Sequence, residues 1–124
     1  MHLIDTSVWI QHFRHGDDRL KTALEENRAL GHDWITGELA CGHLQQRRAT
    51  LELLNRLPKT PTIRHRELLF FIDEHRLFGI GLGLVDLQLL AACRIASCGL
   101  WTNDKALMNA ARNLNISVLS SLPH

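Results

Sequence analysis

Short apolar segments alternate with longer amphipathic segments along the whole chain, and this alternation most limits the folds that the chain can adopt. Short strand candidates with apolar centres lie at 2–5, 99–102 and 116–119, and weaker candidates lie at 29–31 and 62–64. Short strands separated by helices indicate a parallel sheet covered by helices on both faces. The sequence therefore predicts an α/β protein with a central parallel sheet.

Helices are predicted between these strands from the spacing of apolar residues and from the turn residues that bound each segment. Thr6 or Ser7 is expected to cap the first helix, and Asp17 or Asp18 the second. Residues 87–97 are apolar nearly all round, so this helix is expected to be central and buried. The other predicted helices cover about residues 6–14, a segment after Asp18, and residues 33–44, 45–56, 66–78 and 105–113.

The length of 124 residues favours one domain spanning 1–124. No apolar run approaches the roughly 20 residues of a membrane span, so we expect no membrane association. The three cysteines form no CxxC pair. Each of them, Cys41, Cys93 and Cys98, lies in an apolar or helical context, which predicts buried free thiols in a reducing cytoplasm.

Four carboxylates are placed so that they can meet at one edge of the predicted sheet. Asp5 ends the first strand, and Asp104 follows the strand at 99–102. In a parallel sheet both strand ends lie on the same side, where α/β proteins build their sites. Asp86 begins the helix before that strand, and Glu38 lies in the helix after the second strand candidate. The sequence therefore predicts one crevice lined by four acids.

Clustered carboxylates repel one another and require protons or cations to neutralise them. Oxygen ligands favour hard cations such as Mg²⁺ or Mn²⁺. Such ions activate water and stabilise charge on a phosphoryl group during hydrolysis. Thr6, Ser7 or Thr102 could hold a water or a phosphate oxygen. The pattern therefore favours metal-dependent hydrolysis of a phosphate ester.

Each acid taken alone also has an ordinary structural explanation. Asp86 and Asp104 are good helix N-caps, and Glu38 fits a solvated helix position. Asp5 is harder to explain in this way, because an ionised side chain after a buried strand is costly without a partner. The joint pattern is therefore more informative than any one of its members.

Four segments carry a resemblance to a known family. Residues 3–9, 36–39, 83–92 and 100–107 resemble the signature segments of the PIN-domain ribonucleases, in the same order and spacing. Within that group the chain is most similar to the VapC toxins of prokaryotic toxin–antitoxin systems. The resemblance covers essentially the whole chain.

The resemblance implies a three-layer α/β/α PIN-like fold and a toxin with Mg²⁺- or Mn²⁺-dependent endoribonuclease activity. It implies a homodimer and a cognate VapB-type antitoxin whose C-terminal segment blocks the site. The family's acids correspond to Asp5, Glu38, Asp86 and Asp104, as metal ligands and catalytic groups. Its hydroxyl near the last acid corresponds to Thr102, which joins the predicted catalytic set.

Two other surfaces are predicted with less support from the pattern. Arg14, Arg47 and Arg48 are candidate contacts for an RNA backbone, although arginines on a helix are usually just solvated. Trp9 and Phe13, together with Leu39 and Leu44, are a candidate groove for an antitoxin helix, or else part of the core.

Other functions remain open at this stage. One is a non-catalytic RNA-binding or scaffold domain on the same fold. Another is a metal-dependent phosphatase or DNA nuclease. Phosphatases that form an aspartyl phosphate usually carry a second Asp two residues after the first, and here that position is Ser7, which argues against them.

Overall fold

A four-stranded parallel sheet forms the centre of the protein, in a computed structural model that describes residues 1–121. The strand order is β2-β1-β3-β4, so the first strand of the chain is an internal strand. All three strand pairs are parallel. The strands are β1 (His2–Ile4), β2 (Ala29–Leu30), β3 (Gly99–Trp101) and β4 (Val118–Leu119).

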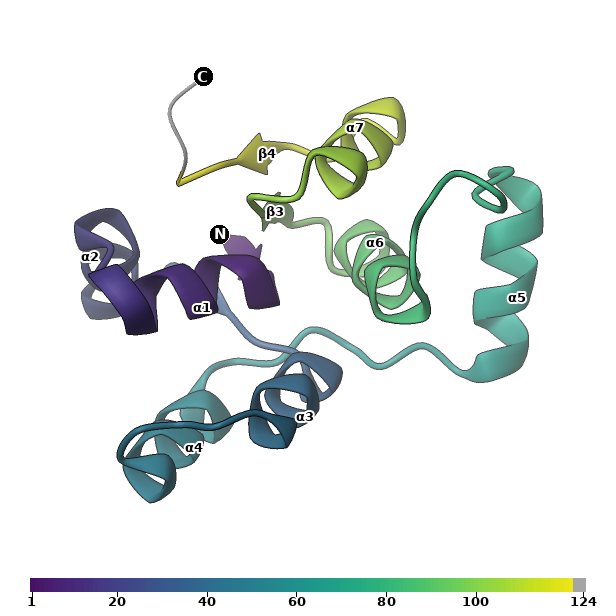
Figure 1. Cartoon of the computed structure of the whole chain (residues 1–124). Coiled ribbons are helices and arrows are strands. Elements are labelled where there is room, and N and C mark those ends of the chain that lie inside the picture. Colours follow the sequence, from purple (N-terminus) through teal and green to yellow (C-terminus); the bar gives the residue numbers. More distant parts are fainter. Residues whose placement is uncertain (122–124) are drawn as a thin grey trace.

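Helices cover both faces of this sheet, which gives the expected three layers (Figure 1). Helices α1 and α2 lie on one side of the strands, and α6 and α7 lie on the other. Helix α3 packs against α1 and α4, and α5 packs against α6. The helices are α1 (Thr6–His15), α2 (Asp18–Glu25), α3 (Asp33–Cys41), α4 (Arg47–Arg56), α5 (His65–Glu74), α6 (Leu84–Ala96) and α7 (Lys105–Asn113).

Helix α6 is the buried helix that the sequence predicts. Every residue from Leu87 to Cys93 is buried, and the neighbouring strands contribute Leu3, Ile4 and Leu100 to the same core. Full burial of one such aliphatic side chain stabilises the fold by roughly 1.5–3 kcal/mol. This packing fixes α6, and with it the position of Asp86 near its first turn.

The register of β1 and β3 decides which residues leave the sheet together. Ile4 pairs with Trp101, and the N–H of Asp5 donates to the carbonyl oxygen of Trp101 at 2.9 Å. The next residues along the two strands, Asp5 and Thr102, therefore emerge side by side at the carboxyl edge of the sheet.

The strand predicted at 62–64 is wrong. The backbone of Ile63 is instead hydrogen-bonded by a buried side chain, because Gln88 accepts from its N–H and donates to its carbonyl oxygen. The glutamine amide offers one donor and one acceptor, as a neighbouring strand would. An isolated parallel β-bridge next to the end of β2 lies earlier in the chain than the predicted strand, between Gly31 and Lys59.

Helix α3 ends at Cys41, three residues before the predicted end. The Arg47 side chain donates to the carbonyl oxygen of Ala40 at 2.8 Å and to that of Gly42 at 3.4 Å, which satisfies carbonyl groups at the helix end. The expectation that all three cysteines are buried is confirmed only for Cys93, because Cys41 is exposed and Cys98 is partly exposed. Within residues 1–121, no helix combines the length and apolarity needed to cross a membrane.

Candidate metal centre

Asp5 is the most firmly held of the predicted site residues. It occupies the N-cap position of α1, where Thr6 or Ser7 was expected, yet its side chain makes no capping hydrogen bond. Its Oδ2 instead accepts from Ser7 Oγ at 2.7 Å and from Thr102 Oγ1 at 2.8 Å. Asp5 is only 6% exposed, so these two hydroxyls compensate for a nearly buried charge.

The same hydroxyls tie the turn after β1 to the turn after β3. Thr102, which is fully buried, accepts from the N–H of Asp104 at 3.0 Å. Ser7 Oγ accepts from the N–H of Asn103, also at 3.0 Å. Asp104 is the N-cap of α7, and its Oδ1 accepts from the N–H of Leu107. Asp104 therefore has the structural role expected of a cap and also lies beside Asp5.

Glu38 and Asp86 reach the same edge of the sheet from helices. Glu38 is exposed on α3, and its Oε1 accepts from Thr6 Oγ1 at 2.6 Å. The sequence predicted Asp86 as the N-cap of its helix, but Gly83 occupies that position and Asp86 is the third residue of α6. Its Oδ2 accepts from the N–H of Gly83 at 3.0 Å.

The charges of the four acids act on one another. Burial raises the pKa of Asp86 above its ordinary value, and the hydrogen bond from Gly83 opposes this shift. The negative charges of Asp5, Asp104 and Glu38 raise the pKa of Asp86 further. The structure therefore brings the four predicted carboxylates into one electrostatic cluster, although they come from four distant segments.

Each carboxylate keeps one oxygen for another partner. One oxygen is hydrogen-bonded by the chain, as described above, and the other accepts no hydrogen bond from residues 1–121. As the side chains stand, no three Asp, Glu, His or Cys residues in this part of the chain are arranged to hold a metal ion. The donor chemistry therefore fits a hard cation, whereas a complete set of ligands requires the side chains to move.

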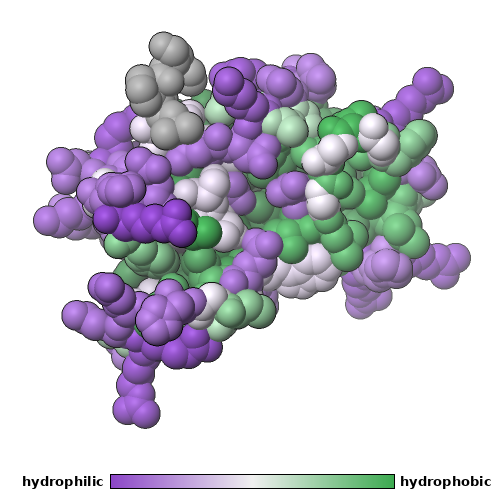
Figure 2. Space-filling view, in the orientation of Figure 1, coloured by the Kyte–Doolittle hydropathy of each residue, from purple (hydrophilic) through white to green (hydrophobic). Residues whose placement is uncertain are grey.

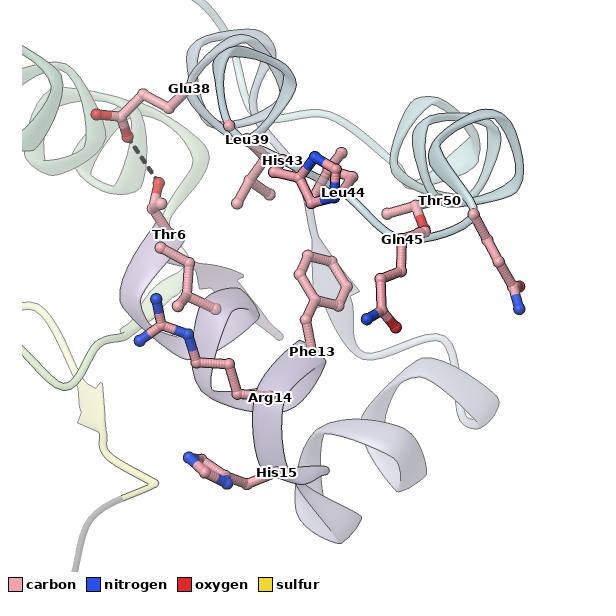
Figure 3. Close-up of a pocket in the computed structure, with 13 residues that line it drawn as sticks. Thr6, Phe13, Arg14, His15, Glu38, Leu39, His43, Leu44, Gln45 and Thr50 are labelled. Carbon is pink, nitrogen blue, oxygen red and sulfur yellow. Dashed lines mark hydrogen bonds between the residues drawn. The ribbon is translucent and has the colours of Figure 1, made fainter.

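A cavity of about 760 Å³ begins at Glu38 and runs between α1 and the α3–α4 segment (Figure 3). The cavity is lined, as predicted, by Phe13, Leu39 and Leu44. Trp9 does not line it, because Trp9 is fully buried and stacks on Phe13 with 5.8 Å between the two ring centroids. The remaining lining residues are Thr6, Ile10, Arg14, His15, Gly42, His43, Gln45, Gln46 and Thr50.

Several residues organise the site in ways that sequence reasoning did not predict: Thr6 and Ser7 were expected to cap a helix or to hold a water or phosphate oxygen, and Asn103 was given no role. Thr6 holds Glu38, and Ser7 links Asp5 to Asn103. The Asn103 side chain accepts from Ser121 N–H at 2.8 Å, which anchors the end of the described chain. The sequence feature that could have pointed to these roles is the pair of hydroxyl residues directly after Asp5, together with the amide directly before Asp104. The sequence does not show which hydrogen-bond partner each of these side chains takes.

Comparison with curated proteins gives a relative for nearly the entire chain. Ribonuclease VapC32 of Mycobacterium tuberculosis, from strains CDC 1551 / Oshkosh and ATCC 25618 / H37Rv, is 40% identical over 119 residues. The match covers 95% of this chain and 96% of the relative. This chain belongs to the VapC family. No family model matches the VapC-family chain.

Solved structures support the fold of this VapC-family chain. The structure of FitAB bound to an IR36 DNA fragment gives a TM-score of 0.65 at 16% identity, covering 100% of this chain and 99% of that one. PAE2754 from Pyrobaculum aerophilum gives 0.63 at 14% identity, covering 97% and 83%. The three-layer PIN-like α/β/α fold predicted from the sequence is thereby confirmed.

Proposed function

We propose that this chain is a toxin endoribonuclease that hydrolyses RNA phosphodiester bonds with Mg²⁺ or Mn²⁺. One observation carries the proposal: four carboxylates from distant segments cluster at one sheet edge, and each keeps an oxygen free of hydrogen bonds from residues 1–121. RNA as the substrate is supported by the activity in the name of the 40% identical relative.

The ligands of the cation would be Asp5, Asp86 and Asp104, with Glu38 completing the set directly or through water. Oxygen donors of this kind favour hard divalent cations, and a bound cation would offset the repulsion that raises the pKa of Asp86. Once bound, the cation supplies an activated water and stabilises charge on the phosphoryl oxygens.

The chain's own residues position these groups. The hydroxyls of Ser7 and Thr102 fix the orientation of Asp5, and Thr102 also holds the backbone of Asp104. Thr102 is buried and so acts through Asp5, as a positioning residue. Glu38 is exposed at the mouth of the cavity, where it can orient the attacking water against a bound phosphodiester.

The cavity is the proposed path of the RNA next to the acids. Arg14, His15 and His43 line it and provide positive or protonatable groups for phosphates (Figure 3). Arg47, which the sequence suggested as a phosphate contact, donates to the carbonyl oxygens at the end of α3 instead. Arg14 is therefore the stronger candidate for contacting the RNA backbone.

The same cavity is the proposed docking site of a VapB-type antitoxin. Ile10, Phe13, Leu39 and Leu44 give it apolar walls next to the acidic cluster, as an amphipathic inhibitor segment requires. An antitoxin seated there would cover Glu38 and exclude RNA. Sequencing the gene immediately upstream tests this assignment: a small protein encoded there should inhibit RNA cleavage when it is co-expressed with this chain.

A second surface is the proposed homodimer interface. Five large apolar side chains are exposed on α5, on the loop after it and at the start of α6, and Figure 2 shows hydrophobic residues gathered on this side. Sedimentation should give a dimer that Phe70→Ser converts to a monomer. The exposed residues are Leu69, Phe70, Phe78, Ile80 and Leu84.

We further propose that residues 1–124 form one PIN domain and that the protein acts in the cytoplasm.

Substitution of Asp5 tests the proposed reaction. Asp5→Asn should reduce Mg²⁺-dependent cleavage of RNA by about a thousandfold, because charge stabilisation by a metal is worth several kcal/mol and each 1.4 kcal/mol is tenfold in rate. Asp73→Asn changes an exposed acid on α5 and should leave cleavage unchanged. If Asp5→Asn cleaves RNA like the wild type, the proposal is wrong.

The alternative is a non-catalytic RNA-binding protein on the same fold. It draws support from the lack, within residues 1–121, of a ready set of three metal ligands. In that case the wild type would bind RNA but leave it intact with either Mg²⁺ or Mn²⁺, and calorimetry would detect no binding of either ion. Cleavage of DNA or of small phosphate esters in parallel assays, with RNA left intact, would identify a different hydrolase.

A further inference from the structure

Two of the three cysteines meet at the end of α6, far from the acids along both α6 and β3. Helix α6 ends at Ala96, Ser97 has a left-handed backbone with φ of 53°, and β3 begins at Gly99. The N–H of Cys98 donates to the carbonyl oxygen of Cys93 at 3.1 Å. This bond and the left-handed residue define a common helix ending that brings the side chains at these two positions close together, and the two thiols interact.

The two thiols share a cavity of about 480 Å³ that is separate from the acidic cluster. Cys93 is buried, with its sulfur 3.6 Å from the carbonyl oxygen of Gly99, whereas Cys98 is partly exposed. The side chains of Arg94 and Asn115 also line the cavity. A small polar molecule that enters the cavity therefore meets Cys98 as the more accessible of the two thiols.

The environment distinguishes the two sulfurs electrostatically. A hydrogen bond from the Cys93 thiol lowers the pKa of Cys98 to about 7, against the effect of burial, and the N–H of Leu3 contributes in the same direction. The same hydrogen bond, together with burial, raises the pKa of Cys93. Cys98 is thus the thiol of the two that ionises more readily, and a thiol whose pKa lies near the ambient pH attacks disulfides most effectively.

We propose that Cys93 and Cys98 form a thiol–disulfide exchange site for low-molecular-weight disulfides, with Cys98 as the attacking thiol and Cys93 as the resolving thiol. The contact between them at the helix end and their shared cavity carry this proposal, which does not depend on the proposed ribonuclease activity.

The exchange proceeds in two balanced steps. The Cys98 thiolate attacks one sulfur of the small disulfide, forms a mixed disulfide and releases one small thiolate, which takes up a proton. Cys93 then loses its proton to solvent and attacks the Cys98 sulfur, and the second small thiolate leaves. Two cysteine thiols are oxidised to one disulfide, and the small disulfide is reduced to two thiols.

Oxidised glutathione is the probe that tests this site, with reaction at neutral pH followed by intact mass and peptide mapping. The wild type should lose two hydrogen atoms through a Cys93–Cys98 disulfide, reversibly with dithiothreitol. This should happen about tenfold faster than glutathione adds to Cys41, the exposed thiol that serves as an internal reference. Modification of Cys41 alone, or at an equal rate, overturns the proposal.

Two variants separate the roles of the thiols. Cys93→Ala should stop at a stable mixed disulfide on Cys98, and Cys98→Ser, which nearly keeps the size of the side chain, should leave Cys93 unmodified because it stays buried. Circular dichroism checks that both variants fold, and the wild-type mapping stands without them. Reaction of Cys93 with glutathione in Cys98→Ser, or a mixed disulfide that persists in the wild type, contradicts the assigned roles.

Discussion

The acidic cluster has two halves that are held in different ways. Asp5 and Asp104 follow adjacent strands, and a chain of hydrogen bonds through Thr102 and Ser7 connects their turns. Glu38 and Asp86 lie on helices α3 and α6, and each carboxylate has one hydrogen bond from the chain. One half is thus fixed by the sheet, and the other depends on the side chains of helices.

This difference suggests how the cluster can bind a cation although no three of its groups within residues 1–121 form a complete site beforehand. For binding of the proposed cation, the strand half would provide a fixed starting point and the helix half would adjust to it. Reorientation of the Glu38 side chain costs little free energy because this side chain is exposed. If this is correct, disturbing the strand half should damage activity more than disturbing the helix half.

The largest of these effects is expected from Thr102→Val. Valine keeps the shape but removes the hydroxyl that holds both Asp5 and the N–H of Asp104, so RNA cleavage should fall about 10–100-fold, as for other groups that orient metal ligands. Thr102→Ser should restore most of the activity. Steady-state cleavage at several Mg²⁺ concentrations measures the effect.

The control for Thr102→Val is Thr60→Val. Thr60 is also buried, and its hydroxyl donates to the carbonyl oxygen of Gly31. Both variants should lose about 0.5–1.5 kcal/mol of unfolding free energy for each hydrogen bond removed, since each variant loses a hydrogen bond donated by a buried threonine hydroxyl. Only Thr102→Val should lose activity under conditions in which both remain folded. Equal losses of activity would mean that Thr102 is merely structural.

A smaller effect is expected in the helix half from Thr6→Val. The lost bond to Glu38 is exposed, and such bonds contribute about 0.5–1.5 kcal/mol, which corresponds to a roughly two- to tenfold reduction in cleavage. Thr22→Val, on the exposed surface of α2, should have no effect. A reduction larger than that of Thr102→Val would reverse the proposed order of the two halves.

The smallest effect is on stability and concerns Asp86. The pKa of Asp86 is higher in the folded than in the unfolded chain, so ionisation of this carboxyl opposes folding. The free energy of unfolding of the metal-free protein therefore falls as pH rises from the acidic range to neutrality. Asp86→Asn should therefore raise the melting temperature of the metal-free protein at pH 7 by about 2 °C, because the group is partly solvated. The wild type should gain stability with Mg²⁺, whereas this variant should gain less.

Melting curves at pH 7 and near pH 4 make the comparison. The benefit of Asp86→Asn should shrink at the lower pH, where the wild-type carboxyl takes up a proton. Asp73→Asn should change the melting temperature little at either pH. A variant that melts lower than the wild type at pH 7 would show that the bond from Gly83 outweighs the repulsion.

The strand half could be read from the sequence because its geometry follows from one rule. Asp5 and Asp104 each come after an apolar strand, and parallel strands place their ends at one edge. The helix half was harder to define. Asp86 looked like an N-cap, but Gly83 takes that position, and glycine has no side chain to mark it.

Long-range side-chain partners explain the other differences. Ile63 looked like a strand residue, but its backbone partner is the side chain of Gln88, which is 25 residues away. The early end of α3 depends on Arg47, from beyond the helix. Local propensity contains no record of such partners, so the elements were predictable and several of their boundaries were not.

The central position of β1 has a consequence for synthesis of the protein. Asp5 is among the first residues to be translated, whereas Thr102, its hydrogen-bond partner, comes 97 residues later. At about 5–20 residues per second, the nascent chain waits roughly 5–20 s for β3. The first acid of the cluster therefore leaves the ribosome long before its partners on β3 exist, so the acidic cluster cannot assemble until nearly the whole chain has been made.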